Sequence, residues 1–232
     1  MSTVSIAVVG SGGAGALTTG NLLLEASARA GCYGVLTRSV GPQIRGGEAA
    51  AMLRLGAEPV AGNSDEFDIL LALDWNNADR FAAELPLGPG SVIIADPGEG
   101  EIPEAIAKST AQVCELPIAA LAKKVKKGRA NLIALGAVAE IIGMEQQPLS
   151  TVLEEKLAGK GEQVLQTSME TVDLGRQAAA GFEKRPLPVR EGNGADRWII
   201  TGNQAAGYGA VKGGIRFVAA YPITPGKGAG VI

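Results

Sequence analysis

The chain has 232 residues, a formal net charge of −3 and a hydrophobic fraction of 46%. This composition is that of a globular protein with a sizeable core, and it excludes an intrinsically disordered chain. The small negative charge gives no electrostatic basis for nucleic acid as a partner. Because the sequence contains no histidine, imidazole is excluded as a general base or metal ligand.

The only two cysteines, Cys32 and Cys114, are too few for a zinc or iron–sulfur site of their own. Their apolar neighbours predict that both are buried as small hydrophobic side chains, and we expect this chain to bind no metal. No signal peptide and no long apolar span is present, which predicts a soluble, cytoplasmic protein that does not enter a membrane.

The chain opens with an apolar, β-branched run over residues 4–9, which predicts a buried strand. The following six residues, 10–15, read Gly-Ser-Gly-Gly-Ala-Gly and predict a tight turn, and a helical pattern begins at Ala16. A strand that passes through such a turn into a helix gathers backbone N–H groups and the positive end of the helix at one point. The sequence therefore predicts an anion-binding loop. Its glycines also match the weakly specific G-x-G-x-x-G dinucleotide motif.

Residues 32–37 predict a second strand, giving a β-α-β beginning. A dinucleotide site needs an acidic residue at the end of this strand to hold the ribose, but Thr37, Arg38 and Ser39 stand there. Since the Arg38 guanidinium can receive a 2′-phosphate, an NADP-binding reductase domain remains an alternative.

The segment 38–50 is unusually rich in residues that donate hydrogen bonds or need a special backbone, including Gly-Pro, Gly-Gly and two arginines. This density favours a loop that contacts a substrate or partner, with Arg38 and Arg45 as anion contacts, over a solvated connection.

Further short apolar runs predict strands that alternate with helices, and this alternation indicates a Rossmann-like α/β fold with a mostly parallel sheet flanked by helices. Asp74 follows one of these strands, where capping of the next helix is its plainer interpretation. The basic run 123–127 is expected to be a solvated helix end. The predicted strands lie at 50–55, 68–74, 91–96 and 111–116, and the helices at 117–127, 131–143, 151–157 and 161–182.

The composition changes near 184–197, where prolines, glycines and charges replace apolar residues. We therefore predict a first domain over 1–183, a linker over 184–197, and a new unit over 198–232 with strand–helix–strand order. So short a unit cannot bury a core of its own, and we expect the chain to be incomplete at this end.

Three segments, 10–26, 37–50 and 202–225, together resemble the fused gamma–alpha subunit of 2-oxoacid:ferredoxin oxidoreductases, in a pattern most like the 2-oxoglutarate synthase type. The resemblance implies that 1–183 is a Rossmann-like gamma domain that binds no dinucleotide. It implies that 198–232 is the beginning of the alpha part, a pyrimidine-type domain of thiamine enzymes. The sequence departs from the family pattern at Val40, where an aromatic residue is usual, and after Pro225.

The activity implied is oxidative decarboxylation of a 2-oxoacid, best matched by 2-oxoglutarate, to an acyl-CoA with reduction of ferredoxin. Thiamine diphosphate, Mg, a 4Fe-4S cluster and coenzyme A belong to the full complex, and none is expected to be held by this chain alone. The implied partner is a beta subunit that carries the thiamine diphosphate and the cluster. A non-catalytic assembly module of such a complex is the alternative.

By resemblance, Tyr221, Pro222, Ile223 and Thr224 belong to the substrate loop of the family. Thr224 would hold the substrate carboxylate or keto oxygen with its hydroxyl, because a threonine between two prolines has a rigid, pre-positioned backbone. No catalytic residue is assigned in this chain.

The resemblance also implies that Gly12, Gly13 and Gly15, together with Arg38 and Arg45, line the coenzyme A side or the wall of the active site. The alternative is that the loop containing both arginines only docks the gamma domain on its partners.

Overall fold

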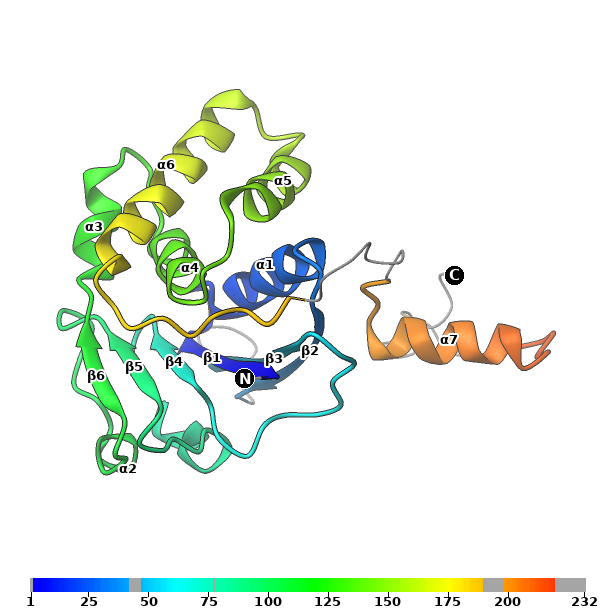
Figure 1. The fold of residues 1–232 in the computed structure, drawn as a ribbon. Coiled ribbons are helices and arrows are strands. Elements are labelled where there is room, and N and C mark those ends of the chain that lie inside the picture. The colour runs from blue at the N-terminus through cyan, green and yellow to red at the C-terminus, as the bar shows by residue number, and fades with distance from the viewer. Residues whose placement is uncertain (1, 42–46, 77, 190–197, 220–232) are drawn as a thin grey trace. The chain divides into compact units, whose positions relative to one another are not determined.

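The computed structural model describes residues 2–41, 47–76, 78–189 and 198–219. The chain forms two compact units, Met1–Asn193 and Gly194–Ile232, which are described separately. In the first unit a six-stranded sheet lies between helices (Figure 1).

The sheet has the strand order β2-β3-β1-β4-β5-β6. Strands β1, β4, β5 and β6 run parallel, whereas β3 pairs antiparallel with both β1 and β2. The six strands are β1 (Thr3–Ser11), β2 (Tyr33–Val40), β3 (Glu48–Gly56), β4 (Ile69–Ala72), β5 (Val92–Ala95) and β6 (Gln112–Glu115).

The predicted α/β fold is confirmed, but the sheet is mixed because of β3. Only a short segment separates Val40 at the end of β2 from Glu48 at the start of β3. Such a connection permits an antiparallel pair, whereas a parallel neighbour needs a crossover of a dozen or more residues. As a result β3 lies between β1 and β2, so the predicted β-α-β beginning does not form the adjacent parallel pair of a dinucleotide fold.

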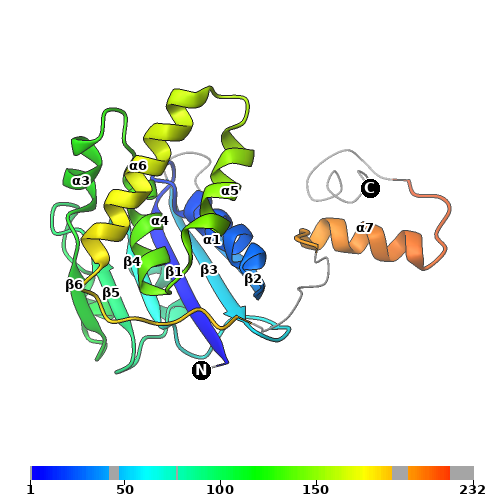
Figure 2. The ribbon, with the colours of Figure 1, turned by 45° about the horizontal axis from the view of Figure 1, so that its top comes forward.

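Five helices cover one face of the sheet, and the 3-10 helix η1 (Ala78–Glu84) and the short α2 (Glu104–Ala107) cover the other (Figures 1 and 2). Alternate residues of the strands divide between two apolar clusters, as the period of two in a strand requires. The five helices are α1 (Ala16–Arg29), α3 (Ile118–Lys124), α4 (Ala130–Ile141), α5 (Gln146–Leu157) and α6 (Glu162–Ala179).

Helix α4 is buried nearly all round, as its uniformly apolar sequence predicts. It packs closely against α6, and the contact is made by a glycine from each helix. A Cβ at Gly136 would collide with the backbone carbonyl of Val172, and one at Gly175 with that of Ile133. The two helix backbones therefore approach more closely than any side chain at these positions allows.

After α6 the chain runs in extended form against the first unit. The Arg185 N–H donates to the Ile141 carbonyl over 2.8 Å, and the Leu187 N–H donates to the Ile142 carbonyl over 2.7 Å. The Leu187 side chain is buried, and the Cys32 thiol, itself buried as predicted, donates to the Pro188 carbonyl. The beginning of the segment expected to be a linker thus packs on the first unit.

The second unit contains helix α7 (Gly202–Lys212), which begins with a reciprocal capping box between Thr201 and Gln204. The Trp198 and Tyr208 rings meet edge to face, with 5.0 Å between centroids. The helix is as predicted, but residues 198–201 and the described part of 215–221 form no strand. A strand needs a neighbour to pair its backbone groups, and the described part of this unit supplies none.

Among the described residues, no helix combines the length and apolar character needed to cross a bilayer.

Candidate functional site

The glycine loop follows β1, the strand from which the chain builds the sheet in two opposite directions. From the end of β1 the chain passes through the loop into α1 and on to β2 on one side of β1, while β4 pairs with β1 on the other side. In open α/β sheets, ligands bind at such a switch point, outside the carboxyl ends of the strands. The fold therefore places the predicted anion-binding loop where a ligand is expected.

The backbone of this loop leaves several N–H groups available. Gly13 and Gly15 adopt φ angles of 103° and 102°, a region that side-chain-bearing residues avoid. The first helical N–H bond runs from Thr19 to the Gly15 carbonyl. Within the described part of the chain, the N–H groups of Gly13, Gly15 and Ala16 donate to no protein acceptor. They are free to bind an anion at the positive end of α1.

Asp74 holds the beginning of the loop in place. Its Oδ2 accepts hydrogen bonds from the Ser11 N–H, over 2.9 Å, and from the Ser11 hydroxyl, over 2.7 Å. Its Oδ1 accepts from the Asn76 N–H, so the carboxylate also closes the turn that precedes η1. The bond to Ser11 could not be predicted, because it joins two strand ends that only the sheet brings together.

Glu48 and Arg80 form an ion pair at the same edge of the sheet. Ser11 pairs with Glu48 across β1 and β3, and the Gly12 N–H donates to the Gly47 carbonyl. The Glu48 side chain is only 2% exposed. A hydrogen bond from its own backbone N–H and the bond from Arg80 hold the pKa of Glu48 below its usual value. Sequence reasoning missed both residues.

Glu48 gives a testable dependence of stability on pH. Because its pKa is lowered in the folded state, its contribution is present above the ordinary value of 4.5 and is lost as the pH falls through the folded pKa. We expect Glu48→Gln to flatten the fall in melting temperature between about pH 5 and pH 3. Glu154→Gln, at an exposed position without an ion pair in the described residues, is the control. Equal acid profiles for Glu48→Gln and the unchanged chain would contradict the expectation.

The structure brings together only part of the predicted site. Gly12, Gly13 and Gly15 share the loop, whereas Arg38 is exposed on β2, two strands away from β1. Arg38 pairs with Ala51, whose side chain belongs to the cluster under α1, so Arg38 stands on the α1 side of the sheet. The other predicted site residues, Arg45, Tyr221, Pro222, Ile223 and Thr224, lie outside the described residues.

Asn131, at the beginning of α4, is a neighbour of the loop that the sequence did not reveal. A Cβ on Gly15 would come within 2.7 Å of the Asn131 Cβ. In the described residues, no group of three or more His, Cys, Asp or Glu side chains is placed to hold a metal ion.

A family model for pyruvate ferredoxin/flavodoxin oxidoreductase matches residues 5–178. Among solved structures, a chain of the 2-oxoglutarate:ferredoxin oxidoreductase from Magnetococcus marinus is 31% identical, with a TM-score of 0.83 over 99% of this chain and 40% of that one. The gamma subunit of a keto/oxoacid ferredoxin oxidoreductase from Geobacter sulfurreducens is 26% identical, with a TM-score of 0.59 over 76% of this chain and 98% of that one.

A curated relative, the ketoisovalerate oxidoreductase subunit VorA of Methanothermobacter thermautotrophicus, is 24% identical over 180 residues, which are 76% of this chain. This chain spans only about a third of that relative, 36% of its length. The Geobacter gamma subunit, in contrast, is covered almost completely. The chain belongs to the pyruvate ferredoxin/flavodoxin oxidoreductase family and contains the gamma-type domain of that family.

Proposed function

We propose that this chain is a subunit of a 2-oxoacid:ferredoxin oxidoreductase. The enzyme would decarboxylate a 2-oxoacid, with 2-oxoglutarate as the first candidate, pass the electrons released to ferredoxin, and transfer the acyl group to coenzyme A. The observation that carries the proposal is the 31% identity, over 99% of the chain, to an enzyme whose structure holds 2-oxoglutarate, coenzyme A and succinyl-CoA.

In this proposal the glycine loop binds a phosphate group of coenzyme A. In the described residues the N–H groups of Gly13, Gly15 and Ala16 donate to no acceptor. Together with the positive end of α1 they support this role, because they form an anion site that needs no charged side chain. Arg38, near the end of β2, and Arg45, in the segment that follows, are proposed to contribute further positive charge. Coenzyme A supplies the thiol that accepts the acyl group.

The proposal assigns to Thr224 the binding of the 2-oxoacid, through its hydroxyl, with Tyr221, Pro222 and Ile223 shaping the same loop. Thiamine diphosphate, Mg and the 4Fe-4S cluster would be carried by a beta subunit, so the chain would act only within a complex. These assignments rest on the resemblance of residues 202–225 to the family.

The test begins with capture of the tagged chain from its native lysate, followed by dye reduction dependent on 2-oxoglutarate, coenzyme A and thiamine diphosphate. We expect a partner with iron–sulfur absorbance to be captured and the complex to reduce the dye faster with 2-oxoglutarate than with pyruvate. Capture without any thiamine-bearing partner would show that the activity proposal is wrong.

The variant Thr224→Val separates a catalytic subunit from an assembly module. It removes the hydroxyl at nearly constant shape, and we expect the complex to assemble while its activity falls by roughly 100-fold. Thr224→Ser keeps a hydroxyl and should restore most of the rate. Unchanged activity in Thr224→Val would favour the assembly module.

A further inference from the structure

A cavity of about 680 Å³ lies within the helix layer of the first unit. One face of α1, the turn before α4, the end of α5 and the beginning of α6 contribute to its walls. Its lining includes no residue of the loop 10–15 and does not include Arg38. The cavity therefore shares no lining residue with the predicted anion-binding loop, although Asn131 in its wall also borders Gly15. Its volume is within the usual range for small-molecule sites.

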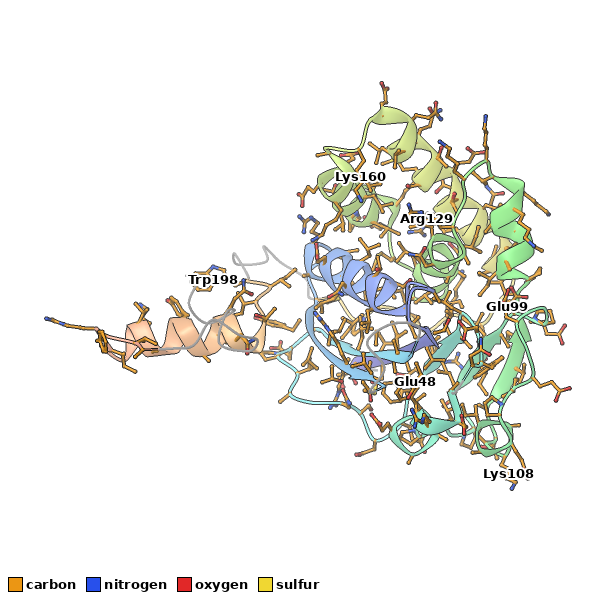
Figure 3. All side chains as sticks on the ribbon, turned by 180° about the vertical axis from the view of Figure 1, so that it is seen from behind. Glu48, Glu99, Lys108, Arg129, Lys160 and Trp198 are labelled. Carbon is orange, nitrogen blue, oxygen red and sulfur yellow. The ribbon has the colours of Figure 1, made fainter. Side chains whose placement is uncertain are left out.

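The rim of the cavity is strongly basic. Lys127, Arg129, Lys156 and Lys160 line it, and Glu25 is the only acidic residue among the described residues of its lining. Lys156 is paired with Glu25 over 2.7 Å, whereas the other three basic residues have no ion pair with any described part of the chain. Two of these three, Arg129 and Lys160, are labelled in Figure 3. Three unpaired cations around one opening favour a ligand with several negative charges.

Lys127 has an unusual backbone for a lysine. Its φ of 66° makes it the one non-glycine residue with positive φ in the described ranges. It occupies a turn closed by the Gly128 N–H, which donates to the Val125 carbonyl over 2.8 Å. Glycine or asparagine is the unstrained choice at such a position. A lysine here is better explained by its side chain at the cavity than by the turn. Lys127 is exposed, as expected for the basic run 123–127, but the helix before it already ends at Lys124.

The inner wall is apolar, with polar groups beside it. Leu132 and Leu153 are buried, and Leu22, Leu157 and Val164 continue the same surface. Thr18, Asn131 and Gln163 add side chains able to donate or accept hydrogen bonds. A ligand that matches this wall and the basic rim has a body with an apolar face, joined to a multiply charged group.

We propose that this cavity binds a nucleoside phosphate, with its phosphates at Lys127, Arg129 and Lys160 and its base and ribose against the leucine wall. The site goes beyond the proposed function, because its lining contains none of the glycine-loop residues and it does not depend on the 2-oxoacid reaction.

Calorimetric titration of the 232-residue chain with ADP tests the proposal. We expect one ADP per chain, an affinity that falls with rising salt, and a loss of at least ~10-fold in Arg129→Gln and in Lys127→Gly. Lys127→Gly also relieves the backbone strain, so its melting temperature should not fall and weaker binding cannot be ascribed to unfolding. Adenosine, which lacks the phosphates, should bind at least ~10-fold more weakly than ADP.

Lys126→Gln is the matched control, because Lys126 is an exposed neighbour outside the cavity lining and the change removes the same charge. The proposal is overturned if ADP gives no saturable heat, or if Lys126→Gln lowers the affinity for ADP as much as Arg129→Gln does.

A competition experiment completes the test: ADP is titrated into the chain after the chain has been saturated with coenzyme A. Unchanged ADP affinity supports a separate site, whereas full exclusion of ADP overturns it and assigns the cavity to the coenzyme.

Discussion

Gly136→Ala is expected to destabilise the first unit by roughly 3 kcal/mol or more. The added Cβ would collide with the Val172 carbonyl, and the same change at Gly175 would collide with the Ile133 carbonyl. Both obstacles are helix backbone, which cannot rotate away as a side chain does. Helices α4 and α6 would have to separate and open the buried packing around α4.

Denaturant unfolding of the purified chain measures this effect. Gly159→Ala is the control, since no atom lies within 4 Å of its added Cβ, and we expect a change within about 0.5 kcal/mol. In the double variant Gly136→Ala/Gly175→Ala, the free energy of unfolding should fall by less than the sum of its decreases in the two single variants. The reason is that the helices need to separate only once. A nearly neutral Gly136→Ala would show that the helices do not cross as closely as described.

The second large effect is expected on ligand binding: Gly15→Ala should lower the affinity of the chain for coenzyme A by at least ~10-fold. An alanine at a φ of 102° is strained, and its Cβ would lie 2.7 Å from that of Asn131. The loop must then move away from α4, and the N–H groups proposed to bind the phosphate move with it. Calorimetric titration of the variant and the unchanged chain with coenzyme A measures the loss of affinity.

Gly13→Ala provides the matched comparison. Its φ of 103° is nearly the same, but no atom lies within 4 Å of its added Cβ, so it carries only the backbone strain of about 1–2 kcal/mol. We expect Gly13→Ala to lower the affinity for coenzyme A less than Gly15→Ala does. Gly15→Ala combined with Asn131→Gly should recover part of the affinity. Wild-type affinity in Gly15→Ala would instead show that the glycine loop does not bind the coenzyme.

The sequence by itself determined the local features of the first unit. The apolar run before Gly10 forms β1, and the glycine turn leads into α1 as its composition predicts. The uniformly apolar pattern of α4 was sufficient to predict its burial. These features depend on neighbouring residues, namely the periodicity of apolar side chains and the conformational freedom of glycine, and so they can be derived from short stretches of sequence.

The tertiary structure alone decided how the predicted elements meet. The antiparallel β3 separates β1 from β2, which removes the arrangement of a dinucleotide fold. Asp74 reaches Ser11 only because β4 lies beside β1, and the cavity at Lys127 exists only because four distant helical segments meet. Each of these depends on strand order and helix packing, where the energy of a contact is shared by residues far apart in the chain. Such contacts cannot be predicted from a local sequence pattern, because they form only when the chain is folded.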